Sequence, residues 1–466
     1  MVPEPDILLL ACYEMGHQPL SLAWPAAALR EAGHSVRSVD LSVAALPRES
    51  AAAARIVGIA APMHTALRLG LRAAEEVRAL NPTAHICFYG LYAWLNADYL
   101  LSSVADFVIA GEYEAPLVKL VNALSATEPE AVLSAIPGVS TRDHREPPYL
   151  ARLSLPVPDR RELPALSHYA RYLENERYSL SGYVEASRGC LHTCRHCPVV
   201  PVYGGRFFVV PVETVMADIR TQVAAGAQHI TFGDPDFLNG PGHALKLARA
   251  FHAEFPNLTF DFTTKVEHIL QHRTMMPELR ALGASFVVSA FEAVSDDILR
   301  RLHKGHTRAD MDEALAILEA ARLPVQPTWL PFTPWTSLDD YLDMLAWIRA
   351  RQLIDHVPAV QLSIRLLIPP DSALLADNPP DSLGELHPAD FAYAWKHPDP
   401  CMDELQARVT VIAEGASPEK PHDAFAAIEQ LAYQIANRSV PGQRPPARPA
   451  RHLRPTPPRL TEDWFC

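Results

Sequence analysis

The stretch "SRGCLHTCRHCP", residues 187–198, holds three of the seven cysteines of this chain within eight positions. Cys190, Cys194 and Cys197 follow a C-x3-C-x2-C spacing. In a reducing compartment, so tight a group of thiols more often binds metal than forms disulfides. Three thiolates from one loop suit three irons of a [4Fe-4S] cluster and leave the fourth iron open to a substrate. The sequence therefore predicts an iron–sulfur site in this loop.

A structural zinc site is the alternative for the same cysteines. His192 or His196 inside the loop would complete a Cys3His set. Against zinc, closed sites of this kind usually come as paired knuckles, and no second Cys/His pair lies near the loop in sequence. Arg188 and Arg195 make the loop polar, which disfavours a third interpretation as ordinary core cysteines.

Length and composition limit the class of protein. The 466 residues exceed the roughly 100–200 usual for one domain, so two or three domains are expected. A net charge of −13 disfavours nucleic acid as a partner. The opening "MVPEPDILLLACYEMG" has no basic stretch before its short apolar run, and no run nears the ~18 apolar residues of a membrane span. We therefore expect a cytoplasmic protein with no membrane partner.

Strand-like and helix-like segments alternate over the first part of the chain. Strands are predicted at 6–12, 34–41, 55–62, 84–90 and 106–112, with helical spacing of apolar residues between them. This alternation predicts an α/β, doubly wound, Rossmann-like domain over 1–130. Such sheets bind ligands beyond the carboxyl ends of their strands.

A second alternation follows the proline-rich stretch 131–170, which is predicted to be a linker. Strands are predicted at 182–187, 229–234, 258–264, 285–290, 325–330 and 360–366. Six βα units predict a partial (β/α)6 TIM-like barrel over 171–375, with its reactive groups at the carboxyl ends of the strands. The cysteine loop follows the first of these strands.

Two further helices, at 401–415 and 423–438, predict a helical extension over 376–440. Residues 441–466 then form a tail rich in proline and arginine. Its segment "VPGQRPPARPARHLRPTPP" favours an extended, solvated linker.

The motif "GCLHTCRHC", followed by "GGRFFVVPVETVMADI", resembles the radical S-adenosylmethionine (radical SAM) enzymes. The early stretch "PLSLAWPAAALREAGHSVRSVDL" resembles the cobalamin-binding domain that precedes the barrel in one branch of that family. The resemblance covers approximately residues 5–375. It implies a [4Fe-4S] cluster on Cys190, Cys194 and Cys197, S-adenosylmethionine (SAM) on the open iron, bound cobalamin, and an external electron donor.

The resemblance also implies contacts to SAM. Asp234 and Asp236, in "FGDPDFLNG", stand where the family contacts the methionine amino group, and Asp236 has a helix cap as its alternative role. Ser289 and Glu292 would approach the methionine carboxylate or the ribose. The Ser-Gly that usually follows this glutamate is Ala-Val here. Lys265, in "TTKVEH", would face the cofactor or stand solvated at a strand end.

The loops at the carboxyl ends of the N-terminal strands would face the corrin ring. They contribute Gln18, Leu20, His64, Thr65, Gly90, Leu91, Gly111 and Glu112. No D-x-H-x-x-G motif offers a lower cobalt ligand. An empty domain is the alternative, because Leu91 and Tyr92 replace an expected glycine-rich stretch.

The ending "RLTEDWFC" resembles a subgroup whose tails close with CCAEP, or with CUAEP in which U is selenocysteine. Only the first member of that pair, Cys466, is present, so a selenocysteine codon read as a stop is one interpretation and an ordinary terminal cysteine is the other. A thiol at the barrel mouth would bind a soft ion or exchange thiols, which makes Cys466 a candidate catalytic residue. Arg365 is a candidate to hold a carboxylate or phosphate of the substrate.

Three functions remain open. The first is a radical enzyme in which cobalamin passes a methyl group to carbon or phosphorus of a small molecule. The second transfers the 3-amino-3-carboxypropyl group of SAM to a soft acceptor such as arsenite. The third is a non-catalytic metal or corrinoid carrier.

Overall fold

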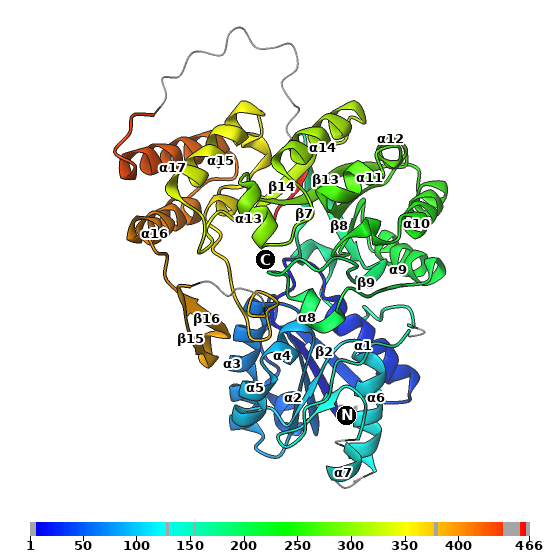
Figure 1. Cartoon of the computed structure of the whole chain (residues 1–466). Coiled ribbons are helices and arrows are strands. Elements are labelled where there is room, and N and C mark those ends of the chain that lie inside the picture. Colours follow the sequence, from blue (N-terminus) through cyan, green and yellow to red (C-terminus); the bar gives the residue numbers. More distant parts are fainter. Residues whose placement is uncertain are drawn as a thin grey trace.

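The computed structural model describes residues 6–126, 130–133, 135–152, 155–376, 381–440 and 457–462. The N-terminal domain is built on a six-stranded sheet of order β2-β1-β3-β4-β5-β6 (Figure 1). Its strands are β1 (Ile7–Ala11), β2 (Val36–Asp40), β3 (Ile56–Ala60), β4 (His85–Tyr89), β5 (Phe107–Ile109) and β6 (Val139–Ser140). The first five run parallel, and β6 is antiparallel to β5.

Helices cover both faces of this sheet. They are α1 (Leu20–Glu31), α2 (Arg48–Ala53), α3 (His64–Leu80), α4 (Leu91–Leu95), α5 (Ala97–Ser103), α6 (Glu114–Ser125) and α7 (Glu130–Leu133). In β1, Ile7 and Leu9 pack with α1 and α6, whereas Leu8 and Leu10 pack with α2 to α5. Because both faces are buried, the strands read as continuous apolar runs. The predicted doubly wound, Rossmann-like domain is confirmed.

The proline-rich stretch predicted as a linker contributes to the N-terminal domain. Its strand β6 extends the sheet, and Tyr149 forms a bridge with Gly111 after β5. Two residues of β6 gave too short a pattern to recognise. A linker was therefore the wrong description of this part of 131–170.

The second sheet has the order β14-β13-β12-β11-β8-β7-β17 and curls into a half-barrel (Figure 1). Five strands are parallel: β8 (Arg177–Val184), β11 (His229–Phe232), β12 (Thr259–Thr264), β13 (Ala284–Glu292) and β14 (Val325–Trp329). Strand β7 (Arg171–Glu174) is antiparallel to β8, and β17 (Arg459–Leu460) is antiparallel to β7.

The outer face of this curled sheet packs under helices. They are α9 (Val212–Ala224), α10 (Pro241–Glu254), α11 (Val266–Gln271), α12 (Met275–Ala281), α13 (Asp296–Arg301), α14 (Arg308–Ala320) and α15 (Leu338–Ala350). Side chains alternate along each strand. Val287 therefore joins the core under the helices, whereas Phe286 and Val288 face the inner side of the sheet.

The sixth barrel strand, predicted at 360–366, does not form. Residues Ala359–Leu362 make a 3-10 turn, and only Arg365 bridges to Phe332 beyond the end of β14. The side chain of Gln361 accepts a hydrogen bond from Trp329 N at 2.8 Å. A side-chain oxygen thus takes the place that a backbone carbonyl of a sixth strand would have.

The chain continues in a hairpin of β15 (Leu383–His387) and β16 (Ala392–Trp395), followed by α16 (Pro400–Glu414) and α17 (Pro421–Ile435). Both helices pack on the barrel core. Residues 441–456 of the predicted solvated tail lie outside the described residues. For Pro457 and Pro458 that prediction is wrong, because both are buried, and β17, which follows them, joins the barrel sheet. Over the described ranges, no helix has the length and apolar character to span a membrane.

Gly111 and Gly33 offer a matched test of the packing of Tyr149 on the N-terminal sheet. Both have positive φ, at +77° and +89°. A Cβ on Gly111 would lie 2.4 Å from Tyr149 O, but a Cβ on Gly33 would meet nothing within 4 Å. We expect Gly33→Ala to cost roughly 1–2 kcal/mol from backbone strain alone. Gly111→Ala should cost clearly more in chemical unfolding, and equal costs would contradict the close contact.

Candidate functional site

A two-stranded ladder closes the base of the cysteine loop. Strand β9 (Ser187–Gly189) pairs antiparallel with β10 (Phe207–Val209), and Cys190 N donates to Arg206 O at 3.1 Å. Gly189 has φ +76°, and a Cβ there would lie 2.4 Å from Arg206 O. Only glycine therefore permits the turn that begins the cysteine motif. Helix α8 (Val199–Tyr203) connects the last cysteine of the loop to strand β10.

The three cysteines carry free thiols. Cys190 and Cys194 are buried and Cys197 is half-buried. Burial raises the pKa of Cys197 to about 12, so this thiol stays protonated until a cation binds. Asn239 supports the loop, because its Oδ1 accepts from Leu191 N at 3.2 Å and lies 3.7 Å from Cys190 Sγ.

The cysteine spacing argues against one shared zinc ion. Among the described residues, the metal-ligand atoms that all lie within 4.8 Å of one another belong to His192, Asp236 and His268, and no cysteine joins such a group. Sulfurs on one tetrahedral zinc would be about 3.8 Å apart, given a Zn–S bond of about 2.3 Å. The three cysteine sulfurs do not all lie within 4.8 Å of one another, and a wider separation between sulfurs fits a cluster of several irons.

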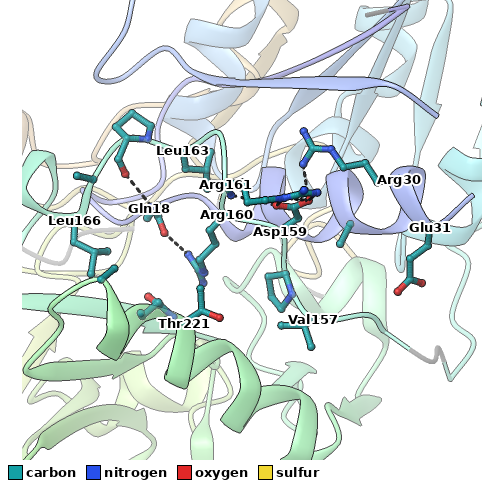
Figure 2. A pocket seen from close by; sticks show the side chains of 16 residues that line it. Gln18, Arg30, Glu31, Val157, Asp159, Arg160, Arg161, Leu163, Leu166 and Thr221 are labelled. Carbon is teal, nitrogen blue, oxygen red and sulfur yellow. Dashed lines mark hydrogen bonds and ion pairs between the residues drawn. The ribbon is translucent and has the colours of Figure 1, made fainter. Parts of the chain in front are cut away.

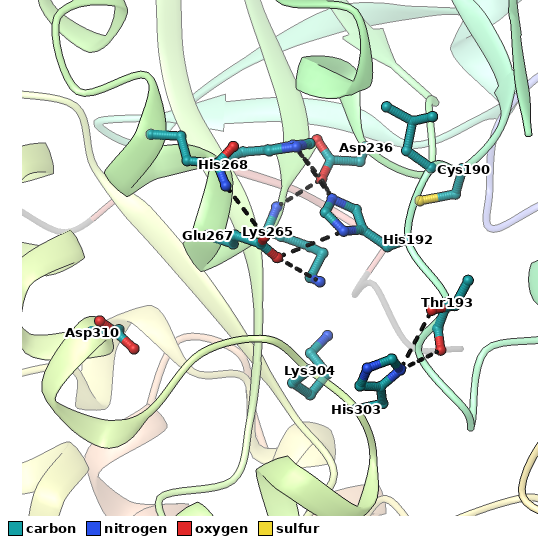
Figure 3. A network of polar contacts seen from close by, with 12 residues as sticks. Cys190, His192, Thr193, Asp236, Lys265, Glu267, His268, His303, Lys304 and Asp310 are labelled. Atoms are coloured by element: carbon teal, nitrogen blue, oxygen red, sulfur yellow. Dashed lines mark hydrogen bonds and ion pairs between the residues drawn. The ribbon is translucent and has the colours of Figure 1, made fainter. Parts of the chain in front are cut away.

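Asp236 is the centre of a polar network beside the loop (Figure 3). It follows β11, and its Oδ1 accepts from Leu238 N at 3.0 Å and from Thr264 Oγ1 at 2.8 Å. The predicted capping role is thus present. Its Oδ2 lies 2.9 Å from His268 Nδ1. Burial by itself would raise the pKa of Asp236, but the contacts of His268 and Thr264 lower it on balance, so the carboxylate is ionised.

Two histidines connect this network to the cysteine loop. His192 Nε2 lies 3.2 Å from His268 Nε2 and 3.7 Å from Asp236 Oδ2. Burial and then Lys265 lower the pKa of His192 to about 4, so its imidazole is neutral. Sequence reasoning considered His192 only as a zinc ligand and missed His268. The signal for His268 was its place in the first turn after β12.

Lys265 is not solvated. It is buried, its N donates to Asp236 Oδ2 at 3.2 Å, and its Nζ pairs with Glu267 Oε2 at 3.2 Å. Asp234 has both carboxylate oxygens engaged, by Ala186 N at 3.0 Å and Ser187 Oγ at 2.5 Å. Burial raises the pKa of Asp234 to about 7. Asp234 therefore holds the start of the cysteine loop.

Glu292 lies where β13 shifts register, with φ +64°. Its Oε1 is 3.1 Å from Lys304 Nζ and 3.4 Å from His196 Nε2. Burial alone would raise the pKa of Glu292, but Lys304 and His196 lower it to about 2. Lys304, which sequence reasoning missed, also lies close enough to Cys194 and Cys197 for its charge to act on them.

Ser289 lies on the other side of the sheet. It is fully buried and shares its face with Val287 and Phe291, which belong to the core under the helices. The register of this strand therefore does not support a direct contact between Ser289 and SAM. Its Oγ has no hydrogen-bond partner among the described residues.

The comparisons with known proteins agree with this geometry. Residues 184–347 match the Radical SAM superfamily. The chain contains a radical SAM domain. Such a domain implies a [4Fe-4S] cluster and SAM, and the three-cysteine donor set at the carboxyl end of a curled parallel sheet fits both.

The similar proteins carry names of several different activities. Hopanoid C-3 methylase of Methylococcus capsulatus is 26% identical over 331 residues, covering 67% of this chain and 62% of that protein. Anaerobic magnesium-protoporphyrin IX monomethyl ester cyclase of Synechocystis is 21% identical, covering 54% and 51%. The match thus spans less than two thirds of the length of either relative.

Two solved structures share the fold. TsrM from Kitasatospora setae, a radical SAM methyltransferase with tryptophan and a SAM analogue bound, has a TM-score of 0.62 at 17% identity, covering 74% of this chain and 71% of that one. OxsB, with aqua-cobalamin and SAM bound, has a TM-score of 0.69 at 14% identity, covering 92% and 71%. At these identities the likeness concerns the fold.

Arg188 joins the radical SAM domain to the N-terminal domain. Its NH1 lies 2.9 Å from Glu112 Oε2 and its NH2 lies 2.7 Å from Glu114 Oε1. Its Nε lies 3.0 Å from Glu185 Oε2 on the barrel side. Tyr203 of α8 also donates to Glu112, at 3.0 Å. Burial raises the pKa of Glu112 and of Glu185, and Arg188 opposes that rise. Glu112 is thus engaged by the cysteine loop rather than open to a corrin ring.

The other predicted corrin contacts are also engaged within the chain. Gly111 packs against Tyr149. Leu91 packs with Trp94 against an apolar cluster that includes Cys190 and Cys197. Gly90, at φ +106°, makes the turn into α4, which lies against α8 (Figure 1). Leu91 and Trp94 thus occupy the space between α4 and the cysteine loop in this structure.

Two loops of the N-terminal sheet have different neighbours. His64 Nε2 lies 2.8 Å from Asp390 O, and its ring meets that of Phe391 edge-on. The hairpin β15–β16 therefore covers this end of β3. Thr65 is exposed beside it. Leu20 is buried in the barrel core cluster.

Gln18 lines a cavity of about 650 Å³ between α1, the segment 157–166 and α9 (Figure 2). Its Oε1 accepts from Arg160 NH1 at 2.8 Å, and Arg160 also pairs with Asp218. Arg30 in the same cavity pairs with Asp159 at 2.7 Å. No cysteine lines this cavity, so it is distinct from the cluster site.

The two predicted catalytic residues have different outcomes. Arg365 pairs with Asp403 at 2.7 Å, donates to Trp395 O at 2.8 Å and lies 3.5 Å from the centre of the Trp395 ring. It anchors the C-terminal extension and is not free to hold a substrate anion. Cys466 lies outside the described residues.

Removing the Arg188 guanidinium should separate the two domains. Arg188→Met leaves buried carboxylates without their cation, which typically costs roughly 3–5 kcal/mol. Without Arg188, the buried carboxyls of Glu112 and Glu185 have folded pKa values raised by burial, so their contribution to stability is present at low pH and lost as pH rises. We expect the deficit in chemical unfolding to be larger at pH 8 than at pH 5.

Arg206→Met is the matched control for this change, because Arg206 is exposed in the same loop. It should change the free energy of unfolding by no more than about 0.5 kcal/mol. Equal effects of the two variants, or a deficit independent of pH, would contradict the role of Arg188.

Proposed function

We propose that this protein is a radical SAM enzyme that transfers a group to a small molecule. The observation that carries the proposal is the three-cysteine loop at the carboxyl end of the curled parallel sheet, with buried, charged side chains facing it from the ends of β11, β12 and β13. When bound, the cluster supplies one electron that breaks a carbon–sulfur bond of SAM. The electron comes from an external donor.

The chain's own residues orient and enclose the reactants. The ionised Asp236, whose oxygens are held by Leu238, Thr264 and Lys265, places a buried negative charge beside the cysteine loop, and this charge attracts the ammonium of the methionine part of SAM. Lys304 offsets the negative charge of thiolates at Cys194 and Cys197. The ion pair of Lys304 with Glu292 keeps its ammonium in place, since both groups are buried. Burial of this region excludes water from the reacting atoms.

Cobalamin belongs to the proposal because of the domain order and the fold shared with OxsB and TsrM. The N-terminal sheet lies below the cysteine loop with α4 facing α8 (Figure 1). Binding between them requires α4 to move away from α8, since Leu91 and Trp94 fill that space. Methyl transfer to carbon or phosphorus is the reaction that this cofactor would support.

Transfer of the 3-amino-3-carboxypropyl group is the second candidate. It is favoured by the presence of Cys466 six residues after Leu460, the last residue of β17, in the sequence. Thiolates bind soft acceptors such as arsenite. A non-catalytic carrier would cleave no SAM, so one product analysis separates all three functions.

The nucleoside released from SAM identifies the reaction. We expect anaerobically reconstituted protein with SAM and a strong reductant to release 5'-deoxyadenosine, measured by mass spectrometry. Cys194→Ala should abolish release, whereas Cys401→Ala should not, because Cys401 lies outside the loop. Methylthioadenosine in place of 5'-deoxyadenosine would establish aminocarboxypropyl transfer. Absence of both nucleosides would contradict an enzymatic function.

Cobalamin binding is tested by the corrinoid that stays with the protein through gel filtration. We expect retention by the natural chain, and more complete retention in Leu91→Ala because the substitution frees space beside α8. Leu69→Ala, on the exposed side of α3, is the matched control and should behave like the natural chain. No retained corrinoid in any of these proteins would remove cobalamin from the proposal.

A further inference from the structure

Two histidine imidazoles face each other beside the cysteine loop (Figure 3). His192 belongs to the loop, His268 lies in the first turn of α11, and their Nε2 atoms are 3.2 Å apart. Asp236, which follows β11, is the third member of this group, because one metal-ligand atom from each of the three residues lies within 4.8 Å of the others. Three elements that are separate in the sequence thus bring two imidazoles and a carboxylate together.

Each imidazole also has a carboxylate beside its other ring nitrogen. Asp236 Oδ2 lies 2.9 Å from His268 Nδ1, and Glu267 Oε2 lies 3.7 Å from His192 Nδ1. A carboxylate in this position favours the tautomer that carries its proton on Nδ1, which leaves the lone pair of Nε2 available to a ligand. Metal-binding histidines in proteins typically have such an outer partner. Here both lone pairs point to the space between the two rings.

The separation of the two Nε2 atoms suits a single metal ion. A bond from a metal to imidazole nitrogen is about 2.0–2.1 Å long, so two nitrogens 3.2 Å apart subtend an angle of about 100° at a shared ion. Tetrahedral coordination needs an angle close to this value. A hydrogen bond between the two rings is the alternative, because it gives a similar distance without an ion.

Burial and charge favour a cation at this position. The exposed fraction of the side chain is 14% for His192, 8% for His268 and 1% for Asp236. Lys265 belongs to the same network, but its Nζ pairs with Glu267 Oε2 at 3.2 Å, and the two charges offset each other. The charge of Asp236 is then left for a cation to balance. Imidazole ligands favour ions such as Zn²⁺, Ni²⁺ and Fe²⁺ over Mg²⁺ and Ca²⁺.

We propose that the Nε2 atoms of His192 and His268 bind one divalent transition-metal ion, and that Asp236 orients the ring of His268. Water or a small ligand completes the coordination of an ion held by two side chains. This site requires neither the cluster nor SAM, so it goes beyond the proposed function. One consequence does rest on that function: SAM, whose ammonium is attracted by Asp236, should compete with the ion.

Equilibrium dialysis of the full chain against Ni²⁺ tests the site. The cluster is first reconstituted under anaerobic conditions so that irons occupy the cysteine loop, and bound nickel is then measured by elemental mass spectrometry. We expect about one ion per chain at this site. His192→Gln and His268→Gln should each raise the Kd for Ni²⁺ at least about tenfold, since each removes one ligand.

His303→Gln is the matched control, because His303 is exposed and contacts the same loop at Thr193 O, 3.2 Å from its Nδ1. It should leave the Kd for Ni²⁺ close to that of the natural chain. Nickel binding that neither His192→Gln nor His268→Gln weakens would overturn the inference.

X-ray absorption at the nickel edge gives a second test that needs no variant. In the natural chain we expect imidazole nitrogens about 2.1 Å from nickel and no sulfur ligand. Sulfur bound to nickel, or no bound nickel, would mean that the two histidines are only a hydrogen-bonded pair. Saturating SAM should also raise the Kd for Ni²⁺ at least about tenfold, because bound SAM places its ammonium beside the same carboxylate.

The metal site and the proposed function can fail separately. Nickel bound by two imidazoles, with no nucleoside released from SAM, would keep the metal site and remove the enzymatic function. Nucleoside release without nickel binding would keep the function and remove the metal site. Nickel binding that SAM does not weaken would keep the metal site and remove Asp236 from the contacts of SAM.

Discussion

The buried guanidinium of Arg188 is the interaction on which the arrangement of the two domains depends. It stands two residues before the first cluster cysteine and meets carboxylates from both domains, Glu112 and Glu114 on one side and Glu185 on the other. Its flat face also lies 5.5 Å from the centre of the Trp24 ring and 5.4 Å from that of Tyr113. Burying three carboxyl groups at the domain boundary costs free energy, and their pairing with Arg188 offsets that cost.

The contacts around Arg188 also set the position of the cysteines. Glu112 accepts hydrogen bonds from both Arg188 and Tyr203. The N-terminal domain therefore contacts the cysteine loop before its first cysteine and after its last one. On the barrel side, Asp234 holds the start of the loop and Asn239 its first turn. The cluster ligands are thus fixed by three elements far apart in sequence. This preorganisation suits a site that must bind a cluster and keep water away from a radical reaction.

The sequence predicted the parts of the fold that depend on local patterns. The cysteine spacing and the alternation of apolar runs sufficed for the radical SAM domain and the N-terminal sheet. It missed features that depend on distant partners. The sequence around Glu112 does not indicate that it pairs with Arg188. The sequence around Arg365 likewise does not indicate that it pairs with Asp403. Strand β17 was missed because proline dominates the segment before it, although Leu460 supplies one of the buried contacts that place it in the barrel.

A double-mutant cycle between Arg188 and Glu114 tests the central claim most directly. The free energy of unfolding is measured for Arg188→Met, Glu114→Gln, the double variant and the natural chain at pH 8. If the guanidinium and carboxylate act as one buried pair across the domains, their coupling energy should lie at about 1.5–3 kcal/mol. Additive effects, with a coupling energy below about 0.5 kcal/mol, would show that the domains are held together by something other than Arg188.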